Sequence, residues 1–292
     1  MFRQVFANSI IAGASYGLVA VSFSLIYSSA RFFYLAHGAV YTVSAYLVFA
    51  VLSFLGLSTP IGVLIAILGA VALGIGMELC VHRPLRRKGS SPEILLLASL
   101  GLMIILQNVI STLFGDATVS IHNHSTREGL DILGARITGI QLCSIMLSFS
   151  FTLALIAMLR WTTAGRQMRA VANDRALASI FGLNCDLLIA SAFAIGSGLV
   201  AVAAILGAYD TDLTPLMGFK AILMGVVAVI VGGVDSIPGA FLGGQLVGAI
   251  EQFAAVWLAT QWQHAILFTV LVLFLLLRPQ GLLGNVQSRA SV

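Results

Sequence analysis

The sequence predicts an all-α polytopic membrane protein with about eight to nine transmembrane helices. Of its 292 residues, 59% are hydrophobic and only 9% are charged, and the mean hydropathy is +1.04. A soluble domain of this size could not cover its surface with so few charges. The apolar runs are mostly close to the ~20 residues that a helix needs to cross a bilayer. We therefore expect one transmembrane domain over residues 1–292, with a cytoplasmic loop at about 160–187.

Charge and cysteine content exclude several other classes of protein. The net charge of +4 does not indicate a nucleic-acid partner, because basic residues in a membrane protein chiefly set its topology. Cys80, Cys143 and Cys185 form no C-x-x-C pair, so neither a zinc site nor a disulfide framework is expected. The first apolar run lacks a small-residue cleavage site, which indicates a retained helix rather than a signal peptide.

The first half of the chain contains five expected spans. Gly13 and Gly17 lie four residues apart in the first, a spacing that lets a neighbouring helix approach closely. Arg31 and His37 mark a short polar interruption after that span. The expected spans are residues 8–27, 38–57, 61–80, 94–114 and 140–159.

The second half contains four further apolar segments. Those at 220–233 and 264–277 have about fourteen residues, so we expect them to be less tilted or only partly inserted. The other two cover 187–208 and 239–259. Two overlapping small-residue faces in the last of these predict close helix packing; they are formed by Gly239, Gly243, Gly244 and Gly248.

The distribution of basic residues predicts the topology. If the basic turn at 83–88 is cytoplasmic and the spans alternate, 11 of the 15 lysines and arginines lie on the cytoplasmic side. This bias places the N-terminus outside and the C-terminus inside. The polar stretch 115–139 then lies outside. It contains His122 and His124, but no third ligand is in view, so we expect a solvated loop and no metal site.

A polar stretch from Arg160 to Asp186 separates the two apolar halves. Four arginines and two aspartates fall within it, and its alanine-rich middle predicts one helix from Arg166 to Phe181. Two interpretations remain open: a solvated helix whose charges fix topology, or a docking helix for a cytoplasmic protein. The second rests on small side chains that permit close approach and on polar anchors, namely Ala170, Ala172, Ala176 and Ala178 with Arg169, Asn173 and Asp174.

No motif for enzyme chemistry is present. The sequence has no G-x-x-x-x-G-K-[ST], G-x-S-x-G or H-E-x-x-H, so nucleotide hydrolysis, serine hydrolysis and zinc proteolysis by these routes are excluded. We expect no catalytic residues and no cofactor. Ionisable residues in the apolar regions could support ion coupling in a secondary transporter, which is the alternative function; the candidates are Asp235, Glu251 and His264.

Polar breaks occur once in each half, at Arg31–His37 and at Val234–Pro238. Such breaks indicate a substrate path, because irregular backbone at membrane depth is tolerated only against water or protein. We expect the translocation pathway to involve Tyr34, His37, Gly38 and Tyr41. The competing interpretation is that His37 only caps the second span.

Four motifs, in order along nearly the whole chain, resemble those of the branched-chain amino acid permeases of ABC importers. They are Ser24–Tyr27 with Arg31–Gly38 and Ser44–Tyr46; Thr163–Asn184; Gly232–Gly244; and Arg278–Leu282. The second resembles the family's loop that docks on the ATPase. The resemblance implies docking residues at Gly165, Arg166, Arg169, Ala170, Asn173, Asp174, Ala178 and Gly182.

The resemblance also implies a set of partners and a location. These are two ATPase subunits, a second related permease subunit and a periplasmic substrate-binding protein, in a prokaryotic inner membrane. The chain departs from the family at Tyr34, Leu35 and Ala39, where Asn, Phe and often an acidic residue are usual. Related systems carry urea, amides or other small polar solutes, so a branched-chain amino acid is one of several expected cargoes.

Overall fold

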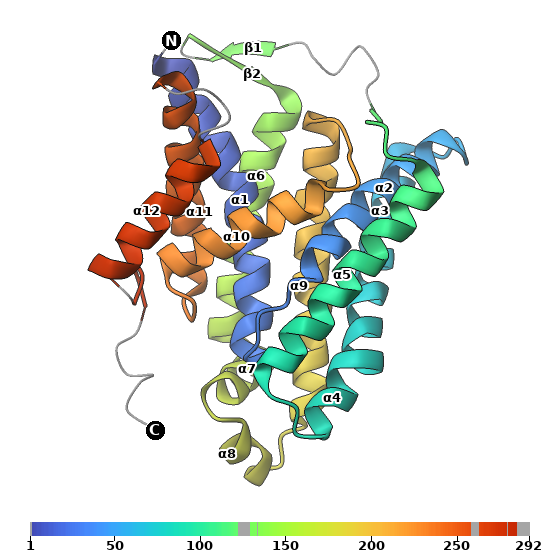
Figure 1. Cartoon of the computed structure of the whole chain (residues 1–292), viewed down its shortest axis with the longest axis vertical. Helices are drawn as coiled ribbons and strands as arrows, with labels where there is room; N and C mark the ends of the chain where they lie inside the picture. The colour runs from blue at the N-terminus through green and yellow to red at the C-terminus, as the bar shows by residue number, and fades with distance from the viewer. Residues whose placement is uncertain (1, 122–128, 133, 258–262, 279, 285–292) are drawn as a thin grey trace. The chain divides into compact units, whose positions relative to one another are not determined.

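The chain folds into helices joined by short turns, with one small β-hairpin, in the part that the structure describes (Figure 1). The structure, a computed structural model, describes residues 2–121, 129–132, 134–257, 263–278 and 280–284. The long helices are α1 (Phe2–Ala30), α2 (His37–Ser53), α3 (Thr59–Met77), α5 (Pro92–Phe114), α6 (Gly139–Trp161), α9 (Cys185–Asp210), α10 (Met217–Gly232), α11 (Ile237–Trp257) and α12 (Gln263–Leu277). The shorter elements are the π-helix η1 (Glu78–His82), α4 (Arg83–Arg87), α7 (Thr163–Asn173), α8 (Arg175–Ile180), β1 (Gly129–Ile132) and β2 (Ala135–Thr138).

The prediction of an all-α membrane protein is confirmed, since each of the nine expected apolar segments is a helix. In the part of the chain that the structure describes, five helical segments are long and apolar enough to cross a membrane, one of them running from α3 through η1 to α4, or six if α10 and α11 form one bent span. The helices α2 and α12 are apolar but shorter. The number of eight to nine crossings and the orientation of the termini therefore remain predictions.

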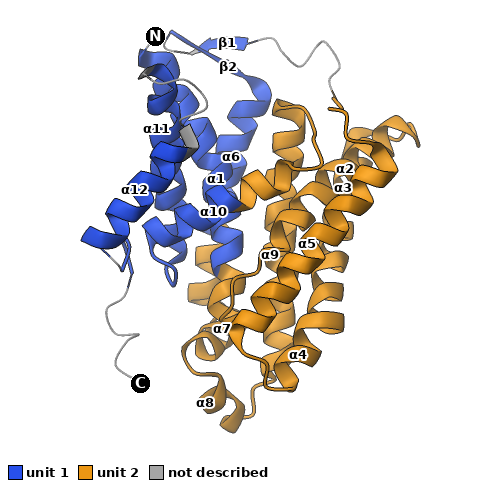
Figure 2. Ribbon diagram, in the orientation of Figure 1, with its two compact units in different colours: residues 1–24, 122–153, 223–292 blue, residues 25–121, 154–222 orange. Residues whose placement is uncertain are grey.

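The helices divide into two compact units, each built from separate parts of the chain (Figure 2). Unit 1 comprises residues 1–24, 122–153 and 223–292, and unit 2 comprises residues 25–121 and 154–222. Three helices (α1, α6 and α10) begin in one unit and end in the other.

In unit 1, α1 and α11 approach closely through glycines. A Cβ on Gly244 would overlap the backbone of Gly17, and one on Gly248 would overlap Gly13. The structure thus places the two glycine motifs that the sequence analysis assigned to helix packing against each other, as expected for small residues at a membrane helix crossing. Phe149 of α6 packs on Phe241 of α11 with ring centroids 4.8 Å apart.

The polar break between α10 and α11 also lies in unit 1. The two helices meet at 118°, and Gly233 has the positive φ of 110° that this turn requires. Gly239 and Gly243 of α11 lie so close to Gly232 and Ala228 of α10 that no side chain would fit. The C-terminal segment completes the turn: the amides of Leu282 and Leu283 donate to Val231 and Gly232 carbonyl oxygens at 2.9 and 3.0 Å, which satisfies the end of α10.

In unit 2, α2, α3 and α9 pack around a core that includes Val48, Ala66 and Ile205. Gly74 of α3 lies against Ser197 of α9 with no room for a side chain. The helix α3 continues through the π-helical turn η1 into α4. Pro84 in the first turn of α4 provides the reason, because its ring lacks an N–H and would clash with the carbonyl four residues earlier in a regular α-helix.

The stretch 115–139 was expected to be a loop, and this expectation is wrong for part of it. Residues 129–132 pair with 135–138 as an antiparallel hairpin, with Gly129 opposite Thr138 and Ile132 opposite Ala135. Gly134 supplies a positive φ of 82° in the connecting turn. His122 and His124 lie outside the described residues.

Candidate functional site

The polar stretch between α6 and α9 forms two short helices. The prediction of one helix from Arg166 to Phe181 is wrong, because Asp174 adopts an extended conformation between α7 and α8. Asp174 ends α7, and its carboxylate accepts a hydrogen bond from the Leu177 amide at 2.9 Å. It thus acts as the N-cap of α8, a role that aspartate favours over a helix-interior position. Gly182 has φ of 78° just after α8, as expected for a residue that ends a helix.

The inner face of this loop packs within unit 2. Gly165 lies in the first turn of α7, so close to Met158 and Leu159 of α6 that a Cβ would overlap their backbone. Met168, Val171 and Ala178 are also buried. The positions of Gly165 and Ala178 therefore indicate packing of the loop onto its own unit rather than an exposed docking surface.

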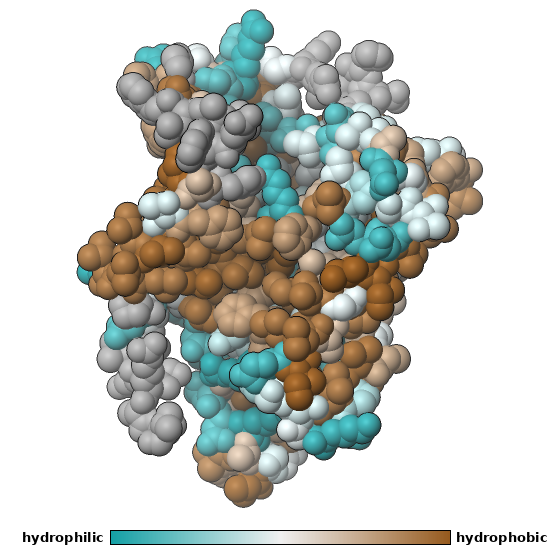
Figure 3. Space-filling view, viewed as in Figure 1, coloured by the Kyte–Doolittle hydropathy of each residue, from teal (hydrophilic) through white to brown (hydrophobic). Residues whose placement is uncertain are grey.

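The outer face combines charge with large apolar side chains. Of the residues that the sequence analysis assigned to docking, Arg166, Arg169, Asn173, Asp174 and Gly182 are exposed and Ala170 is half-buried. The helix α8 adds apolar side chains that the analysis missed: Leu177, Ile180 and Phe181 are exposed, the last two to 79% and 76%. Figure 3 shows apolar side chains at the tip of unit 2 where α8 lies, beside polar ones.

Their spacing could have revealed this surface from the sequence. Residues 177, 180 and 181 are three and four apart and share one face of a helical turn. We call these three residues the α8 apolar patch. A patch of this kind on a polar loop is typical of a protein interface.

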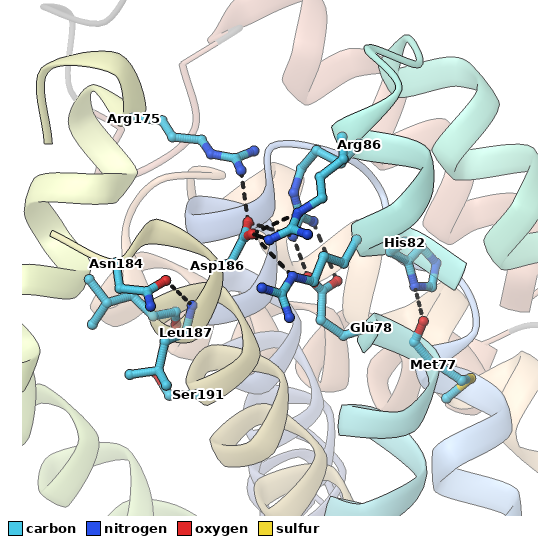
Figure 4. Close-up of polar contacts among 12 residues, drawn as sticks. Met77, Glu78, His82, Arg86, Arg175, Asn184, Asp186, Leu187 and Ser191 are labelled. Carbon is cyan, nitrogen blue, oxygen red and sulfur yellow. Dashed lines mark hydrogen bonds and ion pairs between the residues drawn. The ribbon is translucent and has the colours of Figure 1, made fainter. Parts of the chain in front are cut away.

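Beneath the loop, an ion cluster joins the start of α9 to α4 and η1 (Figure 4). The Asp186 carboxylate accepts hydrogen bonds from Arg83 at 3.0 Å, from Arg87 at 2.8 and 3.1 Å, and from Arg175 at 3.0 Å. Arg86 lies 3.9 Å from the same carboxylate and donates two hydrogen bonds to Glu78. We call these six residues the arginine cluster. It fixes the first residue of α8, Arg175, to the end of α4.

The sequence predicts only a topological role for the arginines at 83–87. Nothing in the sequence indicates that Asp186, about a hundred residues later, would accept hydrogen bonds from two of them. Glu78 and Arg86 are eight residues apart, and a regular α-helix would not place side chains at this spacing next to each other. The π-helical turn between them changes that register.

The first polar break, residues 31–36, lies next to the loop in unit 2. Arg31 has φ of 58°, a conformation that costs a non-glycine residue about 1–3 kcal/mol. Its guanidinium donates a hydrogen bond to the Ala172 carbonyl oxygen in α7. Ser99 of α5 holds the other side of the break, accepting from the Leu35 amide at 3.1 Å and donating to the Phe33 carbonyl oxygen at 3.3 Å. The break is thus in direct contact with the polar loop between α6 and α9.

The four residues that the sequence analysis assigned to the pathway are all buried in unit 2. Tyr34 donates to the Met77 sulfur at 3.6 Å, and His37 is the first residue of α2. Gly38 lies against Gly218 at the start of α10, where a Cβ would not fit, and Tyr41 packs on Gly207. Their geometry brings them together around the break and the start of α2.

His82, which the sequence analysis did not select, belongs to the same cluster. Its ring stacks on Phe32 with centroids 5.0 Å apart and meets Tyr34 edge-on at 5.3 Å. Its Nδ1 lies 3.0 Å from the Met77 carbonyl oxygen. Both His82 and Glu78 come from the π-helical turn, so this turn connects the arginine cluster to the aromatic residues of the break. π-helical turns occur frequently at functional sites.

The alternative coupling residues lie in unit 1. Glu251 in α11 is buried, and its Oε2 has no hydrogen-bond partner among the described residues. The backbone of His264 lies in α12, but its side chain is outside the described residues. Across the described residues, no group of three histidine, cysteine or acidic side chains could hold a metal ion.

Comparison with known proteins identifies similar sequences along almost the whole chain. The family model described as "Branched-chain amino acid transport system / permease component" matches residues 5–276. The LivH proteins of Salmonella typhimurium and Escherichia coli, each named a high-affinity branched-chain amino acid transport system permease protein, are 34% identical over 97% of this chain and 96% of their own. The corresponding BraD protein of Pseudomonas aeruginosa is 30% identical with the same coverage.

A solved structure from Streptococcus pneumoniae is among those with a similar fold. "PsaBC from Streptococcus pneumoniae in complex with Fab" matches with a TM-score of 0.51 and 13% identity, covering 95% of this chain and 92% of that chain.

Proposed function

The chain belongs to the family of permease components of branched-chain amino acid transport systems, and from that membership we propose that it is the transmembrane permease subunit of an ABC importer. It is a multi-pass membrane protein of a transport family and not an enzyme. In the proposed assembly it pairs with a second related permease and two ATPase subunits. A periplasmic binding protein delivers the solute for inward transport across a prokaryotic inner membrane.

The observation that carries the proposal is the outer face of α7 and α8. A membrane protein that needed only a solvated loop would not expose Ile180 and Phe181 on it, because burial of such side chains against a partner is favourable by about 1.5–3 kcal/mol each. Arg166 and Arg169 are exposed on α7 and would set the orientation of an acidic partner surface. We assign this face to the ATPase.

The contacts inside unit 2 indicate how a movement of the loop would reach the residues assigned to the pathway. The loop holds the first polar break through Arg31 and holds the π-helical turn through Arg175, Asp186 and Arg86. A displacement of α8 by the ATPase would therefore act on both sides of the residues assigned to the pathway. Tyr34, His37, Gly38 and Tyr41 are buried in this conformation, so we propose that they meet solute only in another one.

The cargo that we propose is a branched-chain amino acid or a related small polar solute. The names of the relatives support the first. The chain departs from the family pattern at Tyr34, Leu35 and Ala39, which lie in the break or in the first turn of α2. A related small polar solute therefore stays open as the cargo. The N-out, C-in orientation places the arginine-rich loop on the cytoplasmic side, where the ATPase is.

A second candidate is an ion-coupled secondary transporter that uses Glu251. It is favoured by one observation: the carboxylate is buried in an apolar helix, and one of its oxygens has no partner within the part of the chain that the structure describes. Such residues are functional candidates by default. This function would give the α8 apolar patch no role.

Reconstituted vesicles distinguish the two functions. The permease, its ATPases and the binding protein are assayed with ATP and a proton gradient varied independently. An importer accumulates solute with ATP after the gradient is collapsed, and Glu251→Gln transports nearly normally. Accumulation driven by the gradient alone and abolished by Glu251→Gln would refute the importer and support the second candidate.

A further inference from the structure

The arginine cluster contains more positive than negative charge. Its four arginines face only two carboxylates, Glu78 and Asp186. The Glu78–Arg86 pair is buried and balances itself, which leaves Asp186 alone against Arg83, Arg87 and Arg175. The outer part of the cluster therefore has a surplus of two positive charges.

The surplus charge is accessible. The side chains of Arg87 and Arg175 are exposed to 61% and 42%, while Asp186 itself is only 14% exposed. Each guanidinium has five N–H donors, and the bonds to Asp186 use two from Arg87 and one from Arg175. Arg175 and Asp186 also line a surface cavity of about 570 Å³, together with Ser179 and Asn184.

The cluster lies at the ends of two membrane spans. The span 59–87 ends at Arg87, and the span 185–210 begins one residue before Asp186. With 29 and 26 residues they are about 43 and 39 Å long, which exceeds the ~30 Å hydrocarbon core. Their ends therefore reach the headgroup region. Next to the charges, Leu79 and Leu187 are exposed on the same helices, as expected for side chains in contact with acyl chains.

We propose that the outer part of the arginine cluster binds the phosphodiester headgroup of an anionic phospholipid. A phosphodiester offers oxygens that accept paired hydrogen bonds from arginine, and its charge offsets the surplus that Asp186 leaves. Basic pockets at the ends of membrane helices are suited to such headgroups. An acidic segment of a soluble partner would fit the charge but would not contact Leu79 and Leu187. The lipid would stabilise the contact between α8 and α4.

The test uses the full-length permease alone, without ATPases, in lipid nanodiscs and in detergent. Native mass spectrometry measures retention of phosphatidylglycerol and of phosphatidylcholine, and thermal unfolding is followed with each lipid and with inorganic phosphate. The double variant Arg87→Gln with Arg175→Gln removes the two surplus positive charges of the cluster. Arg166→Gln with Arg169→Gln is the matched control, because it removes the same charge from two exposed arginines of the same unit outside the cluster.

We expect the wild-type chain to retain phosphatidylglycerol in preference to phosphatidylcholine. Arg87→Gln with Arg175→Gln should weaken this retention about 25-fold, at roughly fivefold for each arginine near an anionic lipid, and the control pair should weaken it less than threefold. If the double variant does not fold, Arg87→Gln alone, at an exposed side chain, should weaken retention about fivefold.

Three results would overturn the proposal. Equal losses in both variant pairs would indicate only a general surface potential. Equal stabilisation by inorganic phosphate would indicate an anion site without a lipid. Absence of any preference for phosphatidylglycerol over phosphatidylcholine would mean that no anionic lipid is recognised and would leave an acidic segment of a soluble partner as the occupant of the cluster.

Discussion

Phe181→Ala tests the proposed docking role of the α8 apolar patch without disturbing the fold. The Phe181 side chain is 76% exposed, so its truncation should change the stability of the permease itself by no more than about 0.5 kcal/mol. Phe54 in the turn after α2 is a matched control, being 73% exposed in the same unit. Any difference between the two variants therefore reports on a partner rather than on folding.

The expected loss of affinity follows from the exposed area. A phenylalanine side chain buries about 150–250 Å², so three quarters of it leaves roughly 110–190 Å² for a partner to cover. At about 25 cal/mol per Å² this corresponds to about 3–5 kcal/mol as an upper value. If the partner covers only part of this area, the loss of binding free energy is about 2 kcal/mol, which corresponds to about 30-fold in affinity.

The assay is binding of the ATPase subunits to the permease in nanodiscs, with thermal unfolding measured in parallel. Phe181→Ala should bind about 30-fold more weakly at unchanged unfolding temperature, and Phe54→Ala should bind as wild type. Equal binding by both variants would refute the assignment of the α8 apolar patch to the ATPase.

Three further predictions concern the fold and the break. Glu78→Gln removes the carboxylate that neutralises the buried Arg86 and leaves it Asp186 at 3.9 Å, so thermal unfolding should show a loss of stability of about 3–5 kcal/mol, whereas a change of a few tenths of a kcal/mol would mean that the pair is hydrated. Gly244→Leu should prevent α1 from packing on α11 and abolish a monodisperse peak in gel filtration; Gly76→Leu, where a Cβ meets nothing within 4 Å, should not. Tyr41→Cys should resist a membrane-impermeant thiol reagent in the resting state and react during ATP turnover, and protection in every nucleotide state would remove it from the pathway.

The sequence predicted the helices of this fold well because burial in a bilayer depends on composition over ~20 residues. It also selected the glycines at 13, 17, 244 and 248 as packing residues, since small side chains four apart have few other uses in an apolar helix. It could not show that α10 and α11 meet at 118°, because the angle depends on how the C-terminal segment bonds to the end of α10.

The sequence predicted where the polar loop lies but not its detailed structure, and its docking role stays a prediction. Charge density located the loop between α6 and α9, but alanine content suggested one helix where the capping side chain of Asp174 separates two. The small side chains expected on the outer face are partly on the inner one. The arginine cluster depends on a π-helical turn and on contacts between residues about a hundred positions apart, which no local pattern in a single sequence encodes.

The central claim is that α8 faces the cytoplasm and docks on the ATPase, and labelling at Ile180 tests it most directly. A single cysteine is placed there in a chain whose Cys80, Cys143 and Cys185 are replaced by serine, and a membrane-impermeant maleimide is added to vesicles of either orientation. We predict labelling in inside-out vesicles only, and protection from it when the ATPase subunits are bound. Labelling from the outside, or equal labelling with and without the ATPase, would contradict the account.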